Sequence, residues 1–257
     1  TPLWFSIIQM LNVQYFISNS DDGLFERIQL ETKKIGYYNL PEQNLDYLDI
    51  YLKKLDARKT LETITDVVVV GIGGSSLGTK AIYNFLEPLN NLMRRLHFLD
   101  STDPIAIRNC CQKLNLDTSH FLIISKSGTT IETIAIYKYL LGITANHAQK
   151  EPPFTFITDK GSALEAHAEE INALVVNIQD NVGGRFSVLS SIGIVPLALA
   201  GIDIEELLKG ANKIRQSFFG AGYMQDTLLN KATFYAKNST TYNINAIFSY
   251  AESLHSF

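Results

Sequence analysis

The chain has little cysteine and no excess of basic residues. Cysteine occurs only as the adjacent pair Cys110 and Cys111, which excludes a disulfide framework and does not match zinc-ligand spacing. This usage fits a reducing, cytoplasmic location. The 22 basic residues stand against 26 acidic ones, so we expect no broad positive surface and no nucleic-acid partner. Any anion must therefore be held locally.

Long hydrophobic segments are also missing. The longest apolar stretch outside the expected strands, residues 192–202, contains Pro196 and is too short to cross a bilayer, so we expect no membrane association. Residues 1–10 lack the cationic start of a secretion signal. We interpret them as an extra arm or an added lead, with Met10 available as a natural start. The 46% of hydrophobic residues suffices for a proper core.

Short β-branched runs alternate with helix-length segments, which is typical of parallel strands joined by crossover helices. The pattern predicts an α/β fold in which a five-stranded parallel sheet lies between two layers of helices. Strands are expected at residues 67–70, 96–99, 121–124, 154–157 and 173–176, and helices near residues 79–86, 104–114, 131–141 and 162–171. Asp103-Pro104 and residues 158–162 are expected helix entries, each with an oxygen-bearing cap before the first turn.

After Asn177 the sequence becomes rich in helix patterns. Helices are expected at residues 188–200, 204–218 and 227–237, followed by one strand-like run at residues 244–250. Residues 21–51 are expected to form a helical arm packed on the sheet. We divide the chain into an N-terminal arm (residues 1–45), a sheet domain (residues 46–200) and a helical extension (residues 201–257).

Two expected strands run directly into loops of glycine and hydroxyl residues, and a helix follows each loop. Residues 71–76 read Gly-Ile-Gly-Gly-Ser-Ser, and residues 125–130 read Ser-Lys-Ser-Gly-Thr-Thr. Glycines allow close backbone approach, and the free N–H groups at a helix start attract an anion. Since ligands bind at the carboxyl ends of parallel strands, both loops fall at one site. The pair predicts a phosphorylated substrate.

The second loop carries the groups that suit a phosphate. The hydroxyls of Ser125, Ser127, Thr129 and Thr130 can donate to phosphate oxygens, and Lys126 adds a positive charge. A polar turn of this composition can equally be a simple helix cap. The presence of two such loops favours the phosphate site.

The first loop fails the two familiar nucleotide motifs. Ser76 stands where the dinucleotide fingerprint needs its third glycine, and Thr79-Lys80 reverses the lysine and hydroxyl of a P-loop. A nucleotide-binding oxidoreductase is therefore a distant alternative, and we expect no cofactor.

A third polar segment, residues 181–187, follows the last expected strand and contains Gly183-Gly184-Arg185. The permanent charge and forked geometry of Arg185 suit it to stabilise negative charge on substrate oxygens. The plain alternative is a surface arginine in a turn. None of the histidines has a metal-ligand or triad partner at useful spacing, so we expect no metal. We interpret all five as structural or surface residues: His97, His120, His147, His167 and His255.

Together the three motifs resemble the glucose-6-phosphate isomerase family. Residues 71–78, 125–133 and 183–190 match in the family's order, and the resemblance runs from about Ile35 to the end, closest to the compact bacterial form. It implies a first sugar-isomerase (SIS) domain and, within residues 201–257, the incomplete start of a second SIS lobe. It also implies a homodimer whose partner subunit supplies a catalytic histidine.

The resemblance assigns an activity and residue roles. It implies the interconversion of glucose 6-phosphate and fructose 6-phosphate, a step of glycolysis and gluconeogenesis, through an enediolate. Phosphate binding carries over to the loop of Ser125, Lys126, Ser127 and Thr130; sugar contact carries over to Gly74 and Ser75; and enediolate stabilisation carries over to Arg185.

Three further family motifs are absent from the sequence. They are the Glu-Ser-x-Gly-Lys segment with the proton-transferring glutamate, the Gly-x-x-Gly-Gln-His segment with the ring-opening histidine, and a lysine near the family's C-terminus. Glu252 lacks the following Gly-Lys, and Glu132 suits a helix start, so neither is assigned as the base. We expect these 257 residues alone to bind sugar phosphate weakly with little turnover. The alternative is a non-catalytic SIS module that senses a sugar phosphate, but such a module does not need Arg185 between its glycines.

Overall fold

The computed structural model describes residues 23–58, 61–89, 91–145 and 152–257. The expected arm or lead at residues 1–10 lies outside this part. The chain divides into two compact units. One contains residues 209–248 with the described residues up to Lys34, and the other contains residues 35–208 and 249–257.

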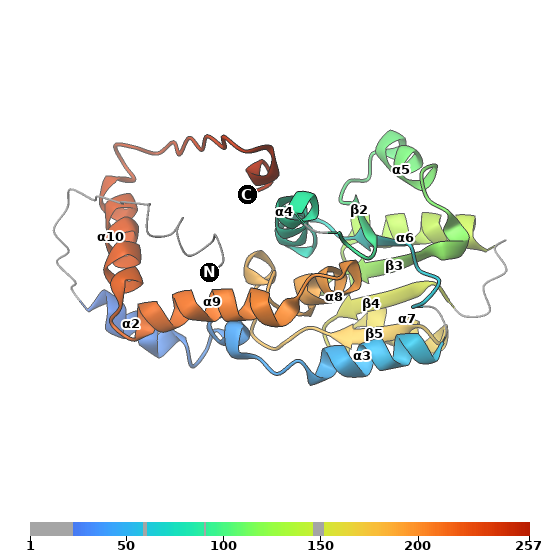
Figure 1. Cartoon of the computed structure of the whole chain (residues 1–257), viewed down its shortest axis with the longest axis horizontal. Coiled ribbons are helices and arrows are strands. Elements are labelled where there is room, and N and C mark those ends of the chain that lie inside the picture. Colours follow the sequence, from blue (N-terminus) through green and yellow to red (C-terminus); the bar gives the residue numbers. More distant parts are fainter. Residues whose placement is uncertain (1–22, 59–60, 90, 146–151) are drawn as a thin grey trace. The chain divides into compact units, whose positions relative to one another are not determined.

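The larger unit is built on a parallel sheet of five strands, as expected (Figure 1). The strands are β1 (Asp66–Val70), β2 (Arg95–Leu99), β3 (Ser119–Ile124), β4 (Phe154–Thr158) and β5 (Leu174–Asn177), in the order β2-β1-β3-β4-β5. The β-branched run of β1 is buried over its whole length, because both faces of a parallel sheet are covered by helices.

Alternate residues of each strand face opposite helical layers. One layer contains α3 (Asp46–Ala57), α4 (Leu77–Leu86) and α8 (Ser191–Ala200), whose apolar side chains join Val67 and Val69 in one core. The other contains α5 (Pro104–Cys111), α6 (Ile131–Thr144) and α7 (Ala163–Glu170), packed with Val68 and Val70. The predicted three-layer α/β arrangement is confirmed.

Capping side chains begin two of these helices, as expected. The carboxylate of Asp103 accepts the N–H of Ile105 at 2.9 Å before α5. The hydroxyl of Ser162 accepts the N–H of Glu165 at 3.1 Å before α7. Short 3₁₀ turns complete the unit: η1 (Gly36–Glu42), η2 (Gly73–Ser75), η3 (Glu87–Leu89), η4 (Leu116–Thr118), η5 (Gly184–Phe186) and η6 (Glu252–Leu254).

The smaller unit is helical. It contains α2 (Leu24–Glu31), most of α9 (Ile204–Phe219) and α10 (Tyr223–Asn238). Phe25 of α2 packs edge-on against Phe218 of α9, with ring centroids 5.6 Å apart. Residues 21–51 were expected to form a helical arm on the sheet. Only α3 packs against the sheet, whereas α2 belongs to the smaller unit. No helix among the described residues has the length and apolar character needed to cross a membrane.

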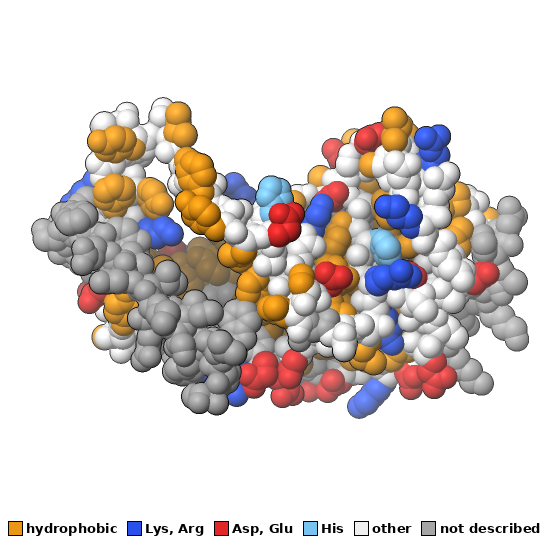
Figure 2. Space-filling view, turned by 45° about the horizontal axis from the view of Figure 1, so that its top comes forward, with side chains coloured by type: hydrophobic (Ala, Val, Ile, Leu, Met, Phe, Trp, Pro, Cys, Tyr) orange, Lys and Arg blue, Asp and Glu red, His pale blue; other side chains and the backbone are white. Residues whose placement is uncertain are grey.

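The expected strand at residues 244–250 is wrong. The structure gives this run no regular secondary structure, and Ile244, Ile247, Phe248 and Tyr250 are between 78% and 99% exposed. Figure 2 shows hydrophobic side chains on the surface along this part of the chain. A strand is held by hydrogen bonds to a neighbouring strand, and the described residues provide no such neighbour here. High β propensity alone therefore does not produce the strand.

Candidate functional site

The strand order places the candidate site at the carboxyl ends of β1 and β3. The chain passes from β1 to β2 on one side and returns to β3 on the other, so the loops after β1 and β3 diverge from a topological switch point. Open parallel sheets bind their ligands at such a point. Val70 and Ile123 are paired in the register, so residues 71–76 and 125–130 leave the same edge of neighbouring strands.

The loop after β1 lies directly against the loop that carries Arg185. A Cβ built on Gly74 would lie 2.1 Å from the carbonyl oxygen of Gly184, so only glycine fits. The buried Ser187 hydroxyl donates to the carbonyl oxygens of Gly74 at 3.1 Å and Gly184 at 2.6 Å. The structure therefore brings Gly74 and Ser75, in η2, beside Arg185, in η5.

The hydroxyls of the second loop are paired with one another. The hydroxyls of Ser125 and Thr130 are 2.9 Å apart, and those of Ser127 and Thr129 are also 2.9 Å apart. Thr130 is the N-cap residue of α6, yet its side chain makes no capping hydrogen bond. The hydroxyls of Ser127 and Ser125 accept the backbone N–H groups of Thr129 at 3.2 Å and Thr130 at 3.5 Å, just before the helix. The loop hydroxyls lie at a helix start whose dipole favours an anion.

Lys126 joins the second loop to the third. Its ammonium group donates to the carbonyl oxygen of Val182 at 2.6 Å. Its own carbonyl oxygen accepts the N–H of Asp159 at 3.1 Å, which fixes the backbone from which the side chain extends. Arg185 itself is exposed, and no hydrogen bond or ion pair to its guanidinium occurs in the described part of the chain. All eight predicted site residues therefore lie in three loops that contact one another at one edge of the sheet.

Two features at this edge were missed by sequence reasoning. The ammonium of Lys80 and the carboxylate of Asp100, which follows β2, form an ion pair at 3.0 Å. The segment of Tyr37 and Gln43 also contacts the Arg185 loop. Neither feature has a local sequence signal, because each depends on residues that only the fold brings together.

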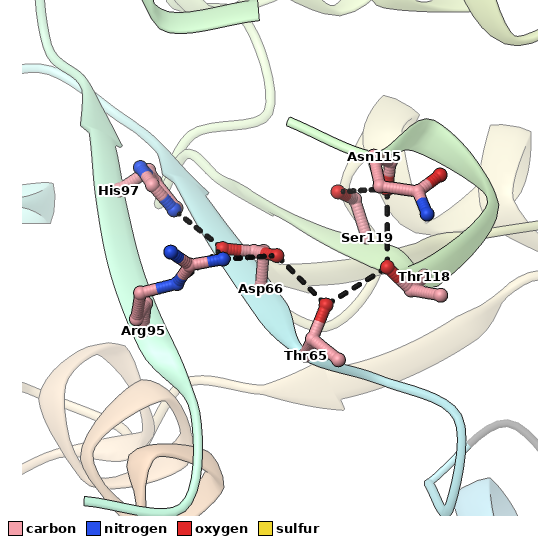
Figure 3. Close-up of polar contacts among 7 residues, drawn as sticks. All are labelled: Thr65, Asp66, Arg95, His97, Asn115, Thr118 and Ser119. Atoms are coloured by element: carbon pink, nitrogen blue, oxygen red, sulfur yellow. Dashed lines mark hydrogen bonds and ion pairs between the residues drawn. The ribbon is translucent and has the colours of Figure 1, made fainter. Parts of the chain in front are cut away.

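A separate polar cluster lies at the opposite edge, where β1 and β2 begin (Figure 3). The buried carboxylate of Asp66 lies 2.8 Å from Nε2 of His97 and 3.0 Å from Nε of Arg95, and it accepts the Thr65 hydroxyl at 2.7 Å. Burial alone would raise the pKa of Asp66, but the hydrogen bonds from His97, Thr65 and Arg95 lower it below its usual value. The position of the cluster marks it as a structural support of the sheet edge.

The other described histidines do not lie in the candidate site. Nε2 of His120 is 2.8 Å from the hydroxyl of Thr155, and burial lowers the pKa of this imidazole to about 3. Nε2 of His167 is 2.8 Å from the hydroxyl of Tyr137. His255 follows η6, and His147 lies outside the described residues. Across the described ranges, no group of three or more His, Cys, Asp or Glu side chains is placed to hold a metal ion.

The fold and the three loops define an α/β protein with a candidate ligand site at the switch point of a parallel sheet. The family model of phosphoglucose isomerase matches residues 47–257, and the chain belongs to this family.

The relatives agree with this assignment. Glucose-6-phosphate isomerase of Campylobacter jejuni is 36% identical over 96% of this chain and 61% of its own length. The Methanocaldococcus jannaschii enzyme of the same name is 36% identical over 88% of this chain and 58% of its own length. The chain thus spans about three fifths of these relatives.

Two solved structures share the fold with a TM-score of 0.72 each. A hypothetical protein from Thermus thermophilus is 29% identical and is matched over 84% of this chain and 52% of its own. A glucose-6-phosphate isomerase from Chlamydia trachomatis is 22% identical and is matched over 86% of this chain and 46% of its own.

Proposed function

We propose that the full-length protein is an aldose–ketose isomerase that interconverts glucose 6-phosphate and fructose 6-phosphate. The observation that carries this proposal is the contact of three loops at the β1/β3 edge, which combines a hydroxyl-rich anion loop, a glycine-lined surface and an exposed arginine. The names of the 36% identical relatives support the choice of substrate.

In this proposal each loop has a separate role. The phosphate replaces the internal hydroxyl pairs of the 125–130 loop and is bound by Ser125, Ser127, Thr129 and Thr130 together with the charge of Lys126. Gly74 and Ser75 contact the open-chain sugar. Moving a proton from C2 to C1 leaves negative charge on O1 or O2, and the Arg185 guanidinium stabilises that charge without exchanging a proton. A separate base transfers the proton, and no residue of this chain is assigned to it.

A coupled assay of the full-length protein tests the activity. Fructose 6-phosphate is supplied, and the glucose 6-phosphate formed is oxidised by an added dehydrogenase. We expect turnover from the wild type and a loss on the order of 100-fold for Arg185→Gln, the size typical of removing a charge-stabilising donor. A full-length protein that binds sugar phosphate but does not isomerise it would instead support the sensing module.

We place the protein in the cytoplasm as a homodimer, with residues 46–200 as the first SIS domain and residues 201–257 leading into a second. The family resemblance supports this assembly. Light scattering of the full-length protein during gel filtration measures it directly, and a monomeric mass would contradict the dimer.

A further inference from the structure

The segment that precedes α3 contacts both ends of the loop that carries Arg185. The clamp is defined here as residues 36–43, and the Arg185 loop as residues 181–189; both lie in the larger unit. We propose that two side chains of the clamp, Tyr37 and Gln43, are positioning residues that hold Arg185 where the enediolate charge develops. This inference rests on the proposed isomerase function and adds two residues that the family motifs do not include.

At the first end the two backbones are in direct contact. The N–H of Gly36 donates to the carbonyl oxygen of Asn181 at 3.0 Å. A Cβ on Gly36 would lie 2.5 Å from the carbonyl oxygen of Asp180, so the approach requires glycine. Asn181 has a φ of +58°, a left-handed conformation that asparagine tolerates better than most residues. The clamp therefore fixes the Arg185 loop at the turn where it leaves β5.

In the middle, an aromatic ring of the clamp packs on the residue next to Arg185. The rings of Tyr37 and Phe186 are stacked with centroids 4.9 Å apart and an interplanar angle of 25°. Phe186 is 55% exposed, and the Tyr37 ring is stacked on its otherwise open side chain. Tyr38 stacks behind Tyr37 at 4.2 Å and supports its ring.

At the second end, the Gln43 amide bridges two segments. Its NH₂ group donates to the carbonyl oxygen of Leu189 at 2.5 Å and to that of Leu40 at 2.9 Å. Its carbonyl oxygen accepts the side-chain N–H of Gln179 at 3.0 Å. The oxygen of Gln179 in turn accepts the N–H of Ser191, the first residue of α8. One side chain thus ties the end of the Arg185 loop to the clamp and to the segment after β5.

The Arg185 loop needs such restraint because of its own composition. Gly183 and Gly184 immediately precede Arg185, and glycine has the largest backbone freedom of all residues. A guanidinium lowers the barrier only if it already points to the place where charge develops. Gly74 and Lys126 contact the loop at Gly184 and Val182. The clamp adds contacts at Asn181, Phe186 and Leu189.

Steady-state kinetics of the full-length protein tests the proposal with matched variants. Tyr37→Leu removes the stacked ring, and Tyr37→Phe keeps it; Gln43→Met keeps the length of the side chain and removes its hydrogen bonds. We expect kcat to fall about 10- to 100-fold in Tyr37→Leu and Gln43→Met, with KM within about twofold of the wild type. The reason is that displacing a catalytic group by about 1 Å lowers the rate by about 100-fold. Tyr37→Phe should retain wild-type kinetics.

A double-mutant cycle separates positioning from direct contact or general damage. In the Arg185→Gln background, Tyr37→Leu and Gln43→Met should cause almost no further loss of kcat, because residues acting through one group are not additive. The same fold-loss in both backgrounds, or a loss in KM alone, would overturn the proposal. Melting curves accompany each variant, and Tyr37→Phe gives a folded reference. An inactive wild type would refute the isomerase function itself, whereas an active wild type with an additive cycle refutes only the clamp.

Discussion

Substituting Gly74 by alanine adds a single methyl group at the closest contact between two of the site loops. The added Cβ would lie 2.1 Å from the carbonyl oxygen of Gly184 and 2.6 Å from its carbonyl carbon. Both are backbone atoms, so no side-chain rotation relieves the clash. The loop of η2 and the Arg185 loop must move apart.

The expected size of the effect follows from these distances. Ordinary contact between such atoms needs more than 3 Å, so the loops must separate by about 1 Å. Overpacking of this kind costs about 1–3 kcal/mol of folding free energy, and a 1 Å displacement of a catalytic group costs about 100-fold in rate. We therefore expect Gly74→Ala to lower kcat about 100-fold and to lower the free energy of unfolding by about 1–3 kcal/mol.

The assay compares Gly74→Ala with Gly142→Ala in the full-length protein. Gly142 lies in α6, and a Cβ there meets no atom within 4 Å, so this control adds the same group in open space. Alanine at this helical position should raise stability by up to about 1 kcal/mol and leave kcat unchanged. A Gly74→Ala enzyme with at least half of the wild-type kcat would refute the contact between the two loops as a requirement of the site.

Further predictions concern protonation and charge. His120 has a pKa lowered by burial from 6.5 to about 3, so the unfolded chain binds a proton between these values that the folded chain does not, and stability falls as pH drops below 6.5. Urea unfolding at several pH values should show that the free energy of unfolding depends less on pH in His120→Asn than in the wild type, by up to about 1.4 kcal/mol per pH unit. An equal pH dependence in both proteins would contradict the lowered pKa of His120. Asp66→Asn should lower the free energy of unfolding by about 2 kcal/mol at neutral pH, and this difference from the wild type should close as pH falls through the lowered pKa of Asp66. A difference that stays constant at all pH values would contradict the stabilising role of the Asp66 carboxylate. Lys126→Ala should raise KM most strongly and also lower kcat because of its bond to Val182, whereas Arg185→Ala should lower kcat with little change in KM; indistinguishable kinetic profiles would count against this division.

Most of the sheet could be predicted because its signal is local. Runs such as residues 67–70 and 121–124 are rich in β-branched and apolar residues, and the structure places them in β1 and β3. The run at residues 244–250 also contains isoleucine, phenylalanine and tyrosine, but it has no neighbouring strand among the described residues. Composition therefore identified residues able to form strands, while pairing decided which of them did.

The site shows the same limit. Gly74, the 125–130 loop and Arg185 could be predicted as site residues because each belongs to a local motif that follows a strand. The clamp was missed because its contacts join residues far apart in sequence: Gln43 and Leu189 are 146 positions apart. Lys126 was predicted to supply charge, but its bond to Val182 appears only once the loops after β3 and β5 are placed side by side.

Amide chemical shifts of this chain, titrated with glucose 6-phosphate and separately with inorganic phosphate, test the central claim most directly. We expect saturable shifts from both ligands at residues 125–131, with glucose 6-phosphate also shifting residues 73–76 and 183–187. Saturable shifts confined to another part of the chain, or none at residues 125–131, would contradict it.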